Sequence, residues 1–324
     1  MKENNLPLLS ICVAAYNVEP YIEECLNSIK NIEKNYYNKE IIIVNDCSKD
    51  KSKDIIQKWI NDNKDINVIF FENKKNLWCS WTYHNASKLA NGKYITFLDW
   101  DDFLIKETFL MKVKMLEENQ NLKIVYWNCY IYSKEEWYIK NFQWDLKDRF
   151  WKPINEIRKS FYTTNPKCSI STSVINLDFF RKIWWFDPNI QINDWVLNIK
   201  IVNNIESEKE IWVVDIPCFA YRMSEWNMTK NYDNMIKEQY EILKRYVNKE
   251  YRNMWYSNIY YEASLLYLRQ NSIWKAFKLL KQSLSNRFSL KRIIIFLSYM
   301  LTPLKLIEKI PNWLKTKIFK ILWL

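Results

Sequence analysis

The sequence predicts an α/β protein whose mostly parallel sheet is flanked by helices, with a helical region added at the C-terminus. Three observations predict this fold class. Short apolar segments alternate with amphipathic segments over the first half of the chain, which is the pattern of strand–helix–strand units. Polar turns follow the apolar segments, as expected where the strands of such a sheet end at a ligand site. From position 232 onwards only helical periodicity is present.

The first hundred residues carry the most regular part of the pattern. The predicted strands are 8–14, 40–44, 66–71 and 93–98, and the predicted helices are 21–32, 52–61 and 79–90. Strand–helix–strand units of this kind form parallel sheets that are covered on both faces. The carboxyl ends of these strands are therefore expected to meet at one edge of the sheet.

The later elements follow with less regular spacing. Strands are expected at 123–133, 169–176 and 211–216, with hairpin-like segments up to 151, and helices at 105–118, 154–162, 177–183 and 193–203. Further helices are expected at 232–247, 250–270, 272–284, 287–301 and 304–323. We therefore predict a first domain, 1–225, with halves 1–104 and 105–225, followed by a basic helical region, 226–324.

Charge is distributed unevenly along the 324 residues. The net charge is +11, and positions 226–324 hold 18 Lys and Arg residues but only 6 Asp and Glu residues, a net of +12. Over 287–324 the basic residues alternate with aliphatic and aromatic ones, which suits an anionic membrane surface. The alternative is an ordinary helical subdomain or a dimer face. No recognisable nucleic-acid-binding module is present, so nucleic acid is not expected as a partner.

Cysteine and histidine usage limits the metal chemistry. The seven cysteines are scattered without a Cys-x-x-Cys spacing, which favours reduced thiols in a cytoplasmic protein. His84 is the single histidine, so a His/Cys zinc site is not expected and carboxylates must hold any metal. The apolar run 6–15 suits a first strand better than a signal peptide.

The predicted strand 93–98 ends in three carboxylates within four positions, Asp99, Asp101 and Asp102. Like charges this close together repel one another. A bound divalent cation is the simplest reason for their presence, because hard cations take oxygen ligands. A solvated acidic turn or a helix cap is the alternative interpretation.

Glycine usage is anomalous. Gly92 is the single glycine, whereas ordinary usage of about 7% predicts roughly 23. Several of the 17 tryptophans stand where backbone geometry favours glycine, such as Trp78, Trp100 and Trp184-Trp185. We hypothesise that many tryptophan positions are UGA codons that are read as glycine in the living organism. Trp59 and Trp195 fit their surroundings as genuine tryptophans.

Six short motifs, in order and in register, resemble those of the family 2 glycosyltransferases with the GT-A fold, a Rossmann-like sheet flanked by helices. They are Val13-Ala14-Ala15-Tyr16-Asn17, Val44-Asn45-Asp46-Cys47-Ser48, Asn76-Leu77-Trp78, Asp99-Trp100-Asp101-Asp102, Trp184-Trp185-Phe186-Asp187 and Asn193-Asp194-Trp195. The likeness covers roughly positions 7–225. Four of the tryptophans fall where the family often has glycine. Tyr83-His84 departs from the family, in which Arg-Asn is common at this point.

The resemblance implies an inverting, metal-dependent glycosyltransferase of the hexosyltransferase type. It would move a sugar from a nucleotide-diphospho-sugar, with a UDP-sugar favoured, to a glycan or lipid-linked acceptor in the synthesis of cell-envelope or surface polysaccharide. Mn²⁺ or Mg²⁺ would be held by Asp101 and Asp99, and Asp194 would be the general base. The expected nucleotide-sugar contacts are Tyr16, Asn17, Glu19, Asp46, Asp99 and Arg222. The expected location is cytoplasmic, peripheral on the inner face of the cytoplasmic membrane.

Other interpretations stay open. Asp46 and Asp194 can each cap the helix that follows, and Arg222 can be an ordinary surface arginine. The alternative function is a degenerate GT-A-fold protein that binds or assembles at the membrane surface without turnover, which literal tryptophans around the cleft would favour. A nucleotidyltransferase is a weaker option, because no Gly-rich phosphate loop follows the first strand.

Overall fold

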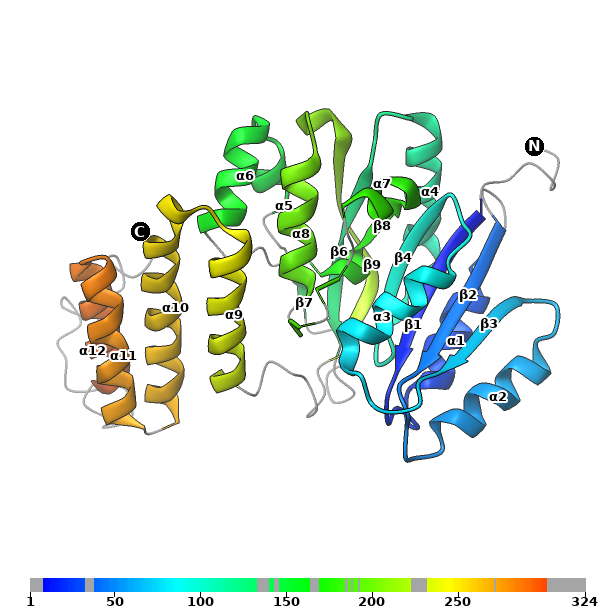
Figure 1. Ribbon diagram of the computed structural model, residues 1–324, viewed down its shortest axis with the longest axis horizontal. Coiled ribbons are helices and arrows are strands. Elements are labelled where there is room, and N and C mark those ends of the chain that lie inside the picture. The colour runs from blue at the N-terminus through cyan, green and yellow to red at the C-terminus, as the bar shows by residue number, and fades with distance from the viewer. Residues whose placement is uncertain are drawn as a thin grey trace. The chain divides into compact units, whose positions relative to one another are not determined.

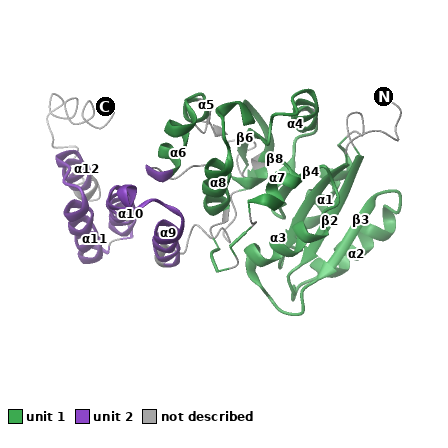
Figure 2. Ribbon diagram, turned by 45° about the horizontal axis from the view of Figure 1, so that its top comes forward, with its two compact units in different colours: residues 1–161, 165–230 green, residues 162–164, 231–324 purple. Residues whose placement is uncertain are grey.

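The computed structural model describes residues 8–32, 38–132, 140–142, 146–163, 169–183, 186–187, 189–191, 193–222, 232–270 and 272–301. The chain divides into two compact units (Figure 2). Unit 1 comprises residues 1–161 and 165–230, and unit 2 comprises residues 162–164 and 231–324.

Unit 1 is built on one mixed sheet. Its strands are β1 (Leu8–Ala15), β2 (Asn38–Asn45), β3 (Asn67–Glu72), β4 (Tyr94–Asp99), β5 (Phe103–Leu104), β6 (Ile124–Tyr132), β7 (Lys140–Phe142), β8 (Ser173–Asn176) and β9 (Ile211–Arg222). Their order is β3-β2-β1-β4-β8-β6-β9-β5, and β7 pairs with β6. The first four strands are parallel to one another, as are β6 and β9, whereas β5, β7 and β8 pair antiparallel with their neighbours. The predicted α/β fold with a mostly parallel sheet and flanking helices is confirmed.

Helices cover both faces of this sheet (Figure 1). They are α1 (Ile22–Lys30), α2 (Ser52–Asp62), α3 (Trp78–Leu89), α4 (Lys106–Glu118), α5 (Leu146–Phe150), α6 (Ile154–Thr163), α7 (Leu177–Lys182) and α8 (Asn193–Asn204). Successive residues of a strand point to opposite faces, so the strands feed two separate cores. In β4, Phe97 packs into the core that contains residues of α3, α7 and α8, and Leu98 into the core that contains residues of α1, α2 and α4.

Unit 2 contains the helices α9 (Tyr232–Tyr246), α10 (Lys249–Arg269), α11 (Ile273–Asn286) and α12 (Leu290–Leu301). One of its buried clusters joins α10, α11 and α12 through Tyr267, Leu280 and Phe296. Within the described part of the chain, no helix is both long and apolar enough to cross a bilayer. The predicted helix 304–323 lies outside the described residues.

The structure differs from the predicted elements at several places, and one is the short helix α5 in the stretch that was expected to be hairpin-like. The two-residue strand β5 is absent from the prediction, because so short a strand leaves no periodic signal. β9 continues to Arg222 instead of ending at 216, and its register against β6 shifts close to Pro217, which cannot donate a ladder hydrogen bond. The predicted strand 169–176 begins with a 3₁₀ turn, Ile170–Thr172, so β8 is shorter than expected.

Candidate functional site

The candidate site lies where β1, β2 and β4 end. Asp46 N, after β2, donates a hydrogen bond of 2.7 Å to Ala15 O, the last carbonyl of β1. Asn17 has a φ of +52° and turns the chain after β1. Its side-chain oxygen accepts a hydrogen bond from Lys49 N at 2.8 Å. The polar residues that follow the first two strands therefore meet at one edge of the sheet.

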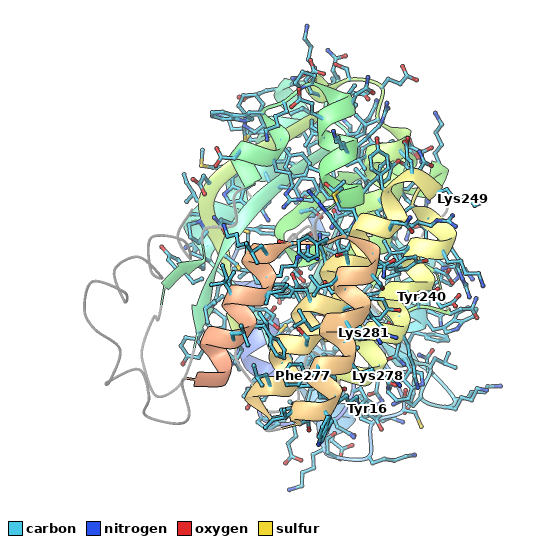
Figure 3. The ribbon with its side chains drawn as sticks, turned by 90° about the vertical axis from the view of Figure 1, so that its left-hand side faces the viewer. Tyr16, Tyr240, Lys249, Phe277, Lys278 and Lys281 are labelled. Atoms are coloured by element: carbon cyan, nitrogen blue, oxygen red, sulfur yellow. The ribbon has the colours of Figure 1, made fainter. Side chains whose placement is uncertain are left out.

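Tyr16 and Glu19 belong to the loop after β1. Glu19 N donates to Asp50 Oδ2 at 3.0 Å, and Glu19 Oε2 accepts from Lys51 N at 3.3 Å. These bonds fix the loop to the residues that precede α2. Tyr16, labelled in Figure 3, keeps 39% of its surface exposed. Its ring therefore remains accessible to a ligand.

Asp46 is buried and connects two loops. Its Oδ1 accepts hydrogen bonds from Asn73 Nδ2 at 2.7 Å and from Leu77 N at 2.8 Å. It does not cap α2, because the carboxylate that accepts from Ser52 N, at 3.0 Å, is Asp50. The capping alternative for Asp46 is therefore wrong. The residue holds the loop before α3 against the end of β2.

Asp99 ends β4, and both of its carboxylate oxygens accept hydrogen bonds from hydroxyl groups. Oδ1 accepts from the Tyr83 hydroxyl at 2.6 Å, and Oδ2 accepts from Ser171 Oγ at 3.4 Å. Burial raises the pKa of Asp99 above its ordinary value, while the two hydroxyl groups act in the opposite direction. Two neutral donors thus set the orientation of this carboxylate.

Arg222, the last residue of β9, donates two hydrogen bonds to the acidic turn 99–102. Its backbone N donates to Asp102 Oδ1 at 2.9 Å, and its Nε donates to Asp101 O at 2.7 Å. Burial raises the pKa of Asp102 well above its ordinary value, and the charges of Asp101 and Asp99 raise it further. The turn therefore concentrates negative charge that a cation would relieve.

The guanidinium of Arg222 is enclosed by aromatic rings. Its central carbon lies 4.8 Å from the ring centroids of both Tyr21 and Tyr132, and Nη2 pairs with Glu24 Oε2 at 2.5 Å. The side chain is 4% exposed. The alternative of an ordinary surface arginine is therefore wrong. The expected contact of Arg222 with the nucleotide-sugar stays a prediction.

Asp194, at the start of α8, is joined to Asp99 through two adjacent residues. Asp194 Oδ1 accepts from Ile170 N at 3.3 Å, and the next residue, Ser171, donates to Asp99. Burial raises the pKa of Asp194 to about 7, and the charge of Asp99 adds to the rise. A carboxylate with this pKa exchanges a proton readily near neutral pH.

The acidic turn supplies oxygen donors without forming a closed cage. No group of three His, Cys, Asp or Glu side chains within the described ranges is arranged to hold a metal ion. The buried Asp102 Oδ2 has no hydrogen-bond partner among those same residues. This arrangement fits Mg²⁺ or Mn²⁺, since such ions take oxygen ligands and Mg²⁺ is commonly bound by one or two carboxylates together with substrate phosphates.

Trp78 has an unusual backbone conformation. Its φ is +70°, although bulky residues rarely adopt positive φ, and its indole is 60% exposed. This conformation supports the hypothesis that position 78 is a glycine in the living organism. Trp100 is not among the described residues with positive φ, and Trp184-Trp185 lie outside the described residues.

The family model described as glycosyl transferase family 2 matches residues 10–184. The chain belongs to this family. The match includes Asp46 and the acidic turn, whereas Asp194 and Arg222 lie beyond its end. The resemblance that the six motifs indicated is therefore confirmed at the level of the family, and the protein is a glycosyltransferase.

Curated relatives of this glycosyltransferase match it over different lengths. The uncharacterized glycosyltransferase MJ1057 of Methanocaldococcus jannaschii is 24% identical over 278 residues, which cover 82% of this chain and 89% of the relative. The putative teichuronic acid biosynthesis glycosyltransferase TuaG of Bacillus subtilis is 31% identical over 112 residues, which cover 35% of this chain and 43% of the relative. The second match thus spans less than half of the relative.

Solved structures share the fold. Staphylococcus aureus TarS 1–349 in complex with UDP-GlcNAc superposes with a TM-score of 0.56 at 18% identity, covering 90% of this chain and 80% of that chain. The mannosyltransferase PcManGT of Pyrobaculum calidifontis, in complex with GDP-Man and Mn²⁺, superposes with a TM-score of 0.58 at 14% identity, covering 99% of this chain and 86% of that chain. At these identities the likeness shows the fold alone.

Sequence reasoning did not assign Tyr83 and Ser171 to the site of this glycosyltransferase. The sequence does hold an indication that Tyr83 belongs to the site, because Tyr83 occupies the position where the family commonly has arginine. Ser171 carries none, because it lies within a segment whose pattern predicts a plain strand. Its side chain reaches Asp99 only because that segment begins with a 3₁₀ turn.

Proposed function

We propose that this glycosyltransferase moves a hexosyl group from a nucleotide-diphospho-sugar to a glycan or lipid-linked acceptor, with inversion at the anomeric carbon. A UDP-sugar is the favoured donor. One observation carries this proposal: the adjacent residues Ile170 and Ser171 donate hydrogen bonds to Asp194, whose pKa is about 7, and to Asp99, respectively. A base that is active near neutrality thereby adjoins the carboxylates expected at the donor.

The donor end of the site is assigned to the loops after β1, β2 and β4. Asp46 is proposed to contact the base and Asp99 the ribose, with Tyr16, Asn17 and Glu19 in the loop after β1. Asp101, with Asp99, is proposed to hold Mn²⁺ or Mg²⁺. When bound, such a cation neutralises charge on the leaving diphosphate. Arg222 is proposed to keep Asp101 in place through its backbone carbonyl.

The acceptor end is assigned to Asp194. Its carboxylate accepts the proton of the acceptor hydroxyl while the hydroxyl oxygen forms the new bond to the anomeric carbon. The bond from that carbon to the diphosphate oxygen breaks, and the nucleoside diphosphate leaves with the electron pair. Attack from the face opposite the leaving group gives inversion. We place this chemistry in a catalytic domain, 1–225, followed by a helical region, 226–324.

Cell-envelope or surface polysaccharide is the proposed destination of the sugar. The printed description of TuaG, a putative teichuronic acid biosynthesis glycosyltransferase, supports this choice. TarS was solved with UDP-GlcNAc and PcManGT with GDP-Man and Mn²⁺, so UDP- and GDP-sugars are the first donors to test.

The test is a screen of UDP-, GDP- and dTDP-sugars with Mn²⁺, measuring nucleoside diphosphate release and, by NMR, the anomeric configuration of the product. Asp194→Asn is expected to lose turnover at least a hundredfold, in line with the usual share of general acid–base catalysis, ~10²–10⁴-fold. Asp101→Asn is also expected to lose turnover, because it removes a proposed ligand of the cation. Asp65→Asn, an exposed carboxylate of unit 1, is the matched control. Full activity in both site variants, or retention of configuration, would contradict the proposal.

A further inference from the structure

Helix α11 exposes apolar and basic side chains on the same side. Ile273, Phe277 and Lys281 recur every four residues along one side of the helix, and Lys278 adjoins Lys281 three positions away on the side turned further from the buried residues. All four are exposed, Ile273 to 46% and Phe277 to 41%. The buried residues of the helix, Ala276, Leu280 and Ser283, lie beside Ile273 and Phe277 and pack within unit 2. We call these four exposed residues the α11 face.

Figure 3 looks onto unit 2 and labels Phe277, Lys278 and Lys281 along this helix. The adjoining helix α12 extends the exposed apolar area. Phe277 packs on Phe296 of α12 with 5.1 Å between ring centroids, and the next residue, Leu297, is exposed. Trp274 is also exposed. It is one of the tryptophans to which the hypothesis of UGA codons read as glycine can apply, so the α11 face is defined without it.

The charged side chains of α11 and α12 all have the same sign. Between Asn271 and Leu301 the sequence contains no Asp or Glu. The same stretch contains the basic residues Lys275, Lys278, Lys281, Arg287, Lys291 and Arg292. The stretch from α11 through α12 therefore combines exposed apolar side chains with six basic residues, against which the neighbouring helix α10 sets Glu262, whose charge acts on Arg292.

We propose that the α11 face docks this glycosyltransferase on a membrane surface that contains anionic lipids. Apolar side chains can enter the boundary between headgroups and acyl chains while the lysine ammonium groups meet phosphates. Each basic residue near an anionic surface adds about 1 kcal/mol, roughly a fivefold gain in partitioning. A second copy of the chain is a poor occupant, because a symmetric pair would bring like charges together.

Nucleic acid is also a poorer occupant than a lipid surface. A phosphate backbone would satisfy the lysines but would leave Ile273 and Phe277 in water. At a membrane interface, the lysines can meet phosphates while Ile273 and Phe277 leave the water. With 14 residues, α11 is about 21 Å long, so it suits a helix that lies in the plane of the interface. Binding to lipid requires no sugar transfer, so it can be tested even if the proposed function fails.

The experiment is co-sedimentation of the full chain with two sets of vesicles. One set contains phosphatidylcholine alone, and the other contains phosphatidylcholine with phosphatidylglycerol. We expect binding only to the anionic vesicles, and a decline with added salt. Lys278→Glu/Lys281→Glu is expected to lower the partition coefficient by at least roughly 30-fold, because two favourable charges are lost. Ile273→Asn tests the apolar part and is expected to lower it about tenfold.

The matched control is Lys64→Glu/Lys209→Glu, which makes the same charge change at exposed residues of unit 1. It is expected to bind nearly as well as the parent chain. Circular dichroism on every variant separates lost binding from lost folding. The proposal is overturned if the parent chain ignores anionic vesicles, or if the two charge variants bind alike. It is equally overturned if Lys278→Glu/Lys281→Glu changes the molecular mass in solution instead of vesicle binding.

Discussion

The hydroxyl of Tyr83 lies 2.6 Å from a carboxylate oxygen of Asp99, so helix α3 orients the side chain that ends β4. Tyr83 is itself fixed by packing, edge-on against Phe97 at 5.2 Å and stacked on Phe186 at 5.7 Å. A tyrosine orients the carboxylate without neutralising it, unlike the arginine that is common at this position of the family. Under the proposed function, more of the charge compensation would therefore fall to the cation and the substrate.

Tyr83→Phe should lower kcat of sugar transfer by about 10- to 100-fold, since a hydrogen bond to a charged group contributes about 1.5–3 kcal/mol. The KM for the acceptor should stay nearly unchanged, because Asp99 is proposed to contact the donor. The control is Tyr94→Phe, which removes a hydroxyl that donates to Glu117 from the opposite end of β4. Equal losses in the two variants would show that the effect is structural.

The kcat of sugar transfer should rise with pH along a single limb whose midpoint lies at about 7, the value to which burial raises the pKa of Asp194. The sign follows from the role of the residue, because only the deprotonated carboxylate accepts the acceptor's proton. Rates measured from pH 5 to 9 at saturating substrate check this. A flat profile across neutrality would exclude Asp194 as the base.

Asp194→Asn should make the fold more stable at alkaline pH although it removes activity. The pKa of Asp194 is about 7 in the folded state, above the ordinary value of about 3.9, so the folded state binds its proton more tightly. Stability contributed by the protonated group is present below the ordinary pKa and is lost as pH rises to about 7. Melting curves of the two chains should therefore diverge with rising pH. If the melting temperature of the parent chain instead rose relative to that of Asp194→Asn with rising pH, the pKa of Asp194 would be lowered in the folded state and not raised.

Lys39→Met should destabilise unit 1 by about 2–3 kcal/mol, measured by urea unfolding. The Lys39 ammonium is buried and donates to three carbonyls at the end of α1, those of Ile29, Lys30 and Ile32, at 2.6, 2.8 and 2.9 Å. Methionine leaves these carbonyls without their donor and removes a cation from a helix C-terminus. Lys58→Met, which removes an exposed lysine, should cost less than about 0.5 kcal/mol.

Trp78→Gly should stabilise the chain by about 1 kcal/mol, because left-handed backbone costs a residue with a side chain about that much. The matched variant Trp81→Gly should destabilise it by about 1 kcal/mol, since Trp81 lies inside α3. Urea unfolding of the three chains provides the comparison. The gene gives an independent check: a UGG codon at position 78 would refute the recoding hypothesis there.

The first half of the predicted domain, 1–104, could be predicted from sequence because its strands and helices alternate and each has a strong period. β1 to β4 and α1 to α3 lie within a few residues of their predicted bounds. The second half was harder, because β8 and β9 join the sheet through long-range pairing that leaves little local signal. β5 shows this most clearly, since its pairing with β9 joins Phe103 to Ala220.

The candidate site was predictable where the residues form motifs. The acidic turn and Asp46 stand at strand ends that the pattern of alternation predicts. The surroundings of those residues were not predictable, because they come from distant segments. Ser171 reaches Asp99 from 72 positions away, and Arg222 reaches Asp102 from 120 positions away. Sequence therefore indicates which carboxylates are present, and tertiary structure determines their orientation and pKa.

The hydrogen bonds that Arg222 donates to Asp101 and Asp102 determine how much of the chain must be synthesised before the acidic turn is held in place. A nascent chain that has emerged only through residue 102 already carries every carboxylate of the turn, but it lacks β9, the strand that holds Asp101 and Asp102. Domains fold as units while the ribosome works from the N-terminus. A product that stops before β9 should therefore lack the hydrogen bonds that hold the acidic turn, so the turn becomes ordered only after most of unit 1 has been made.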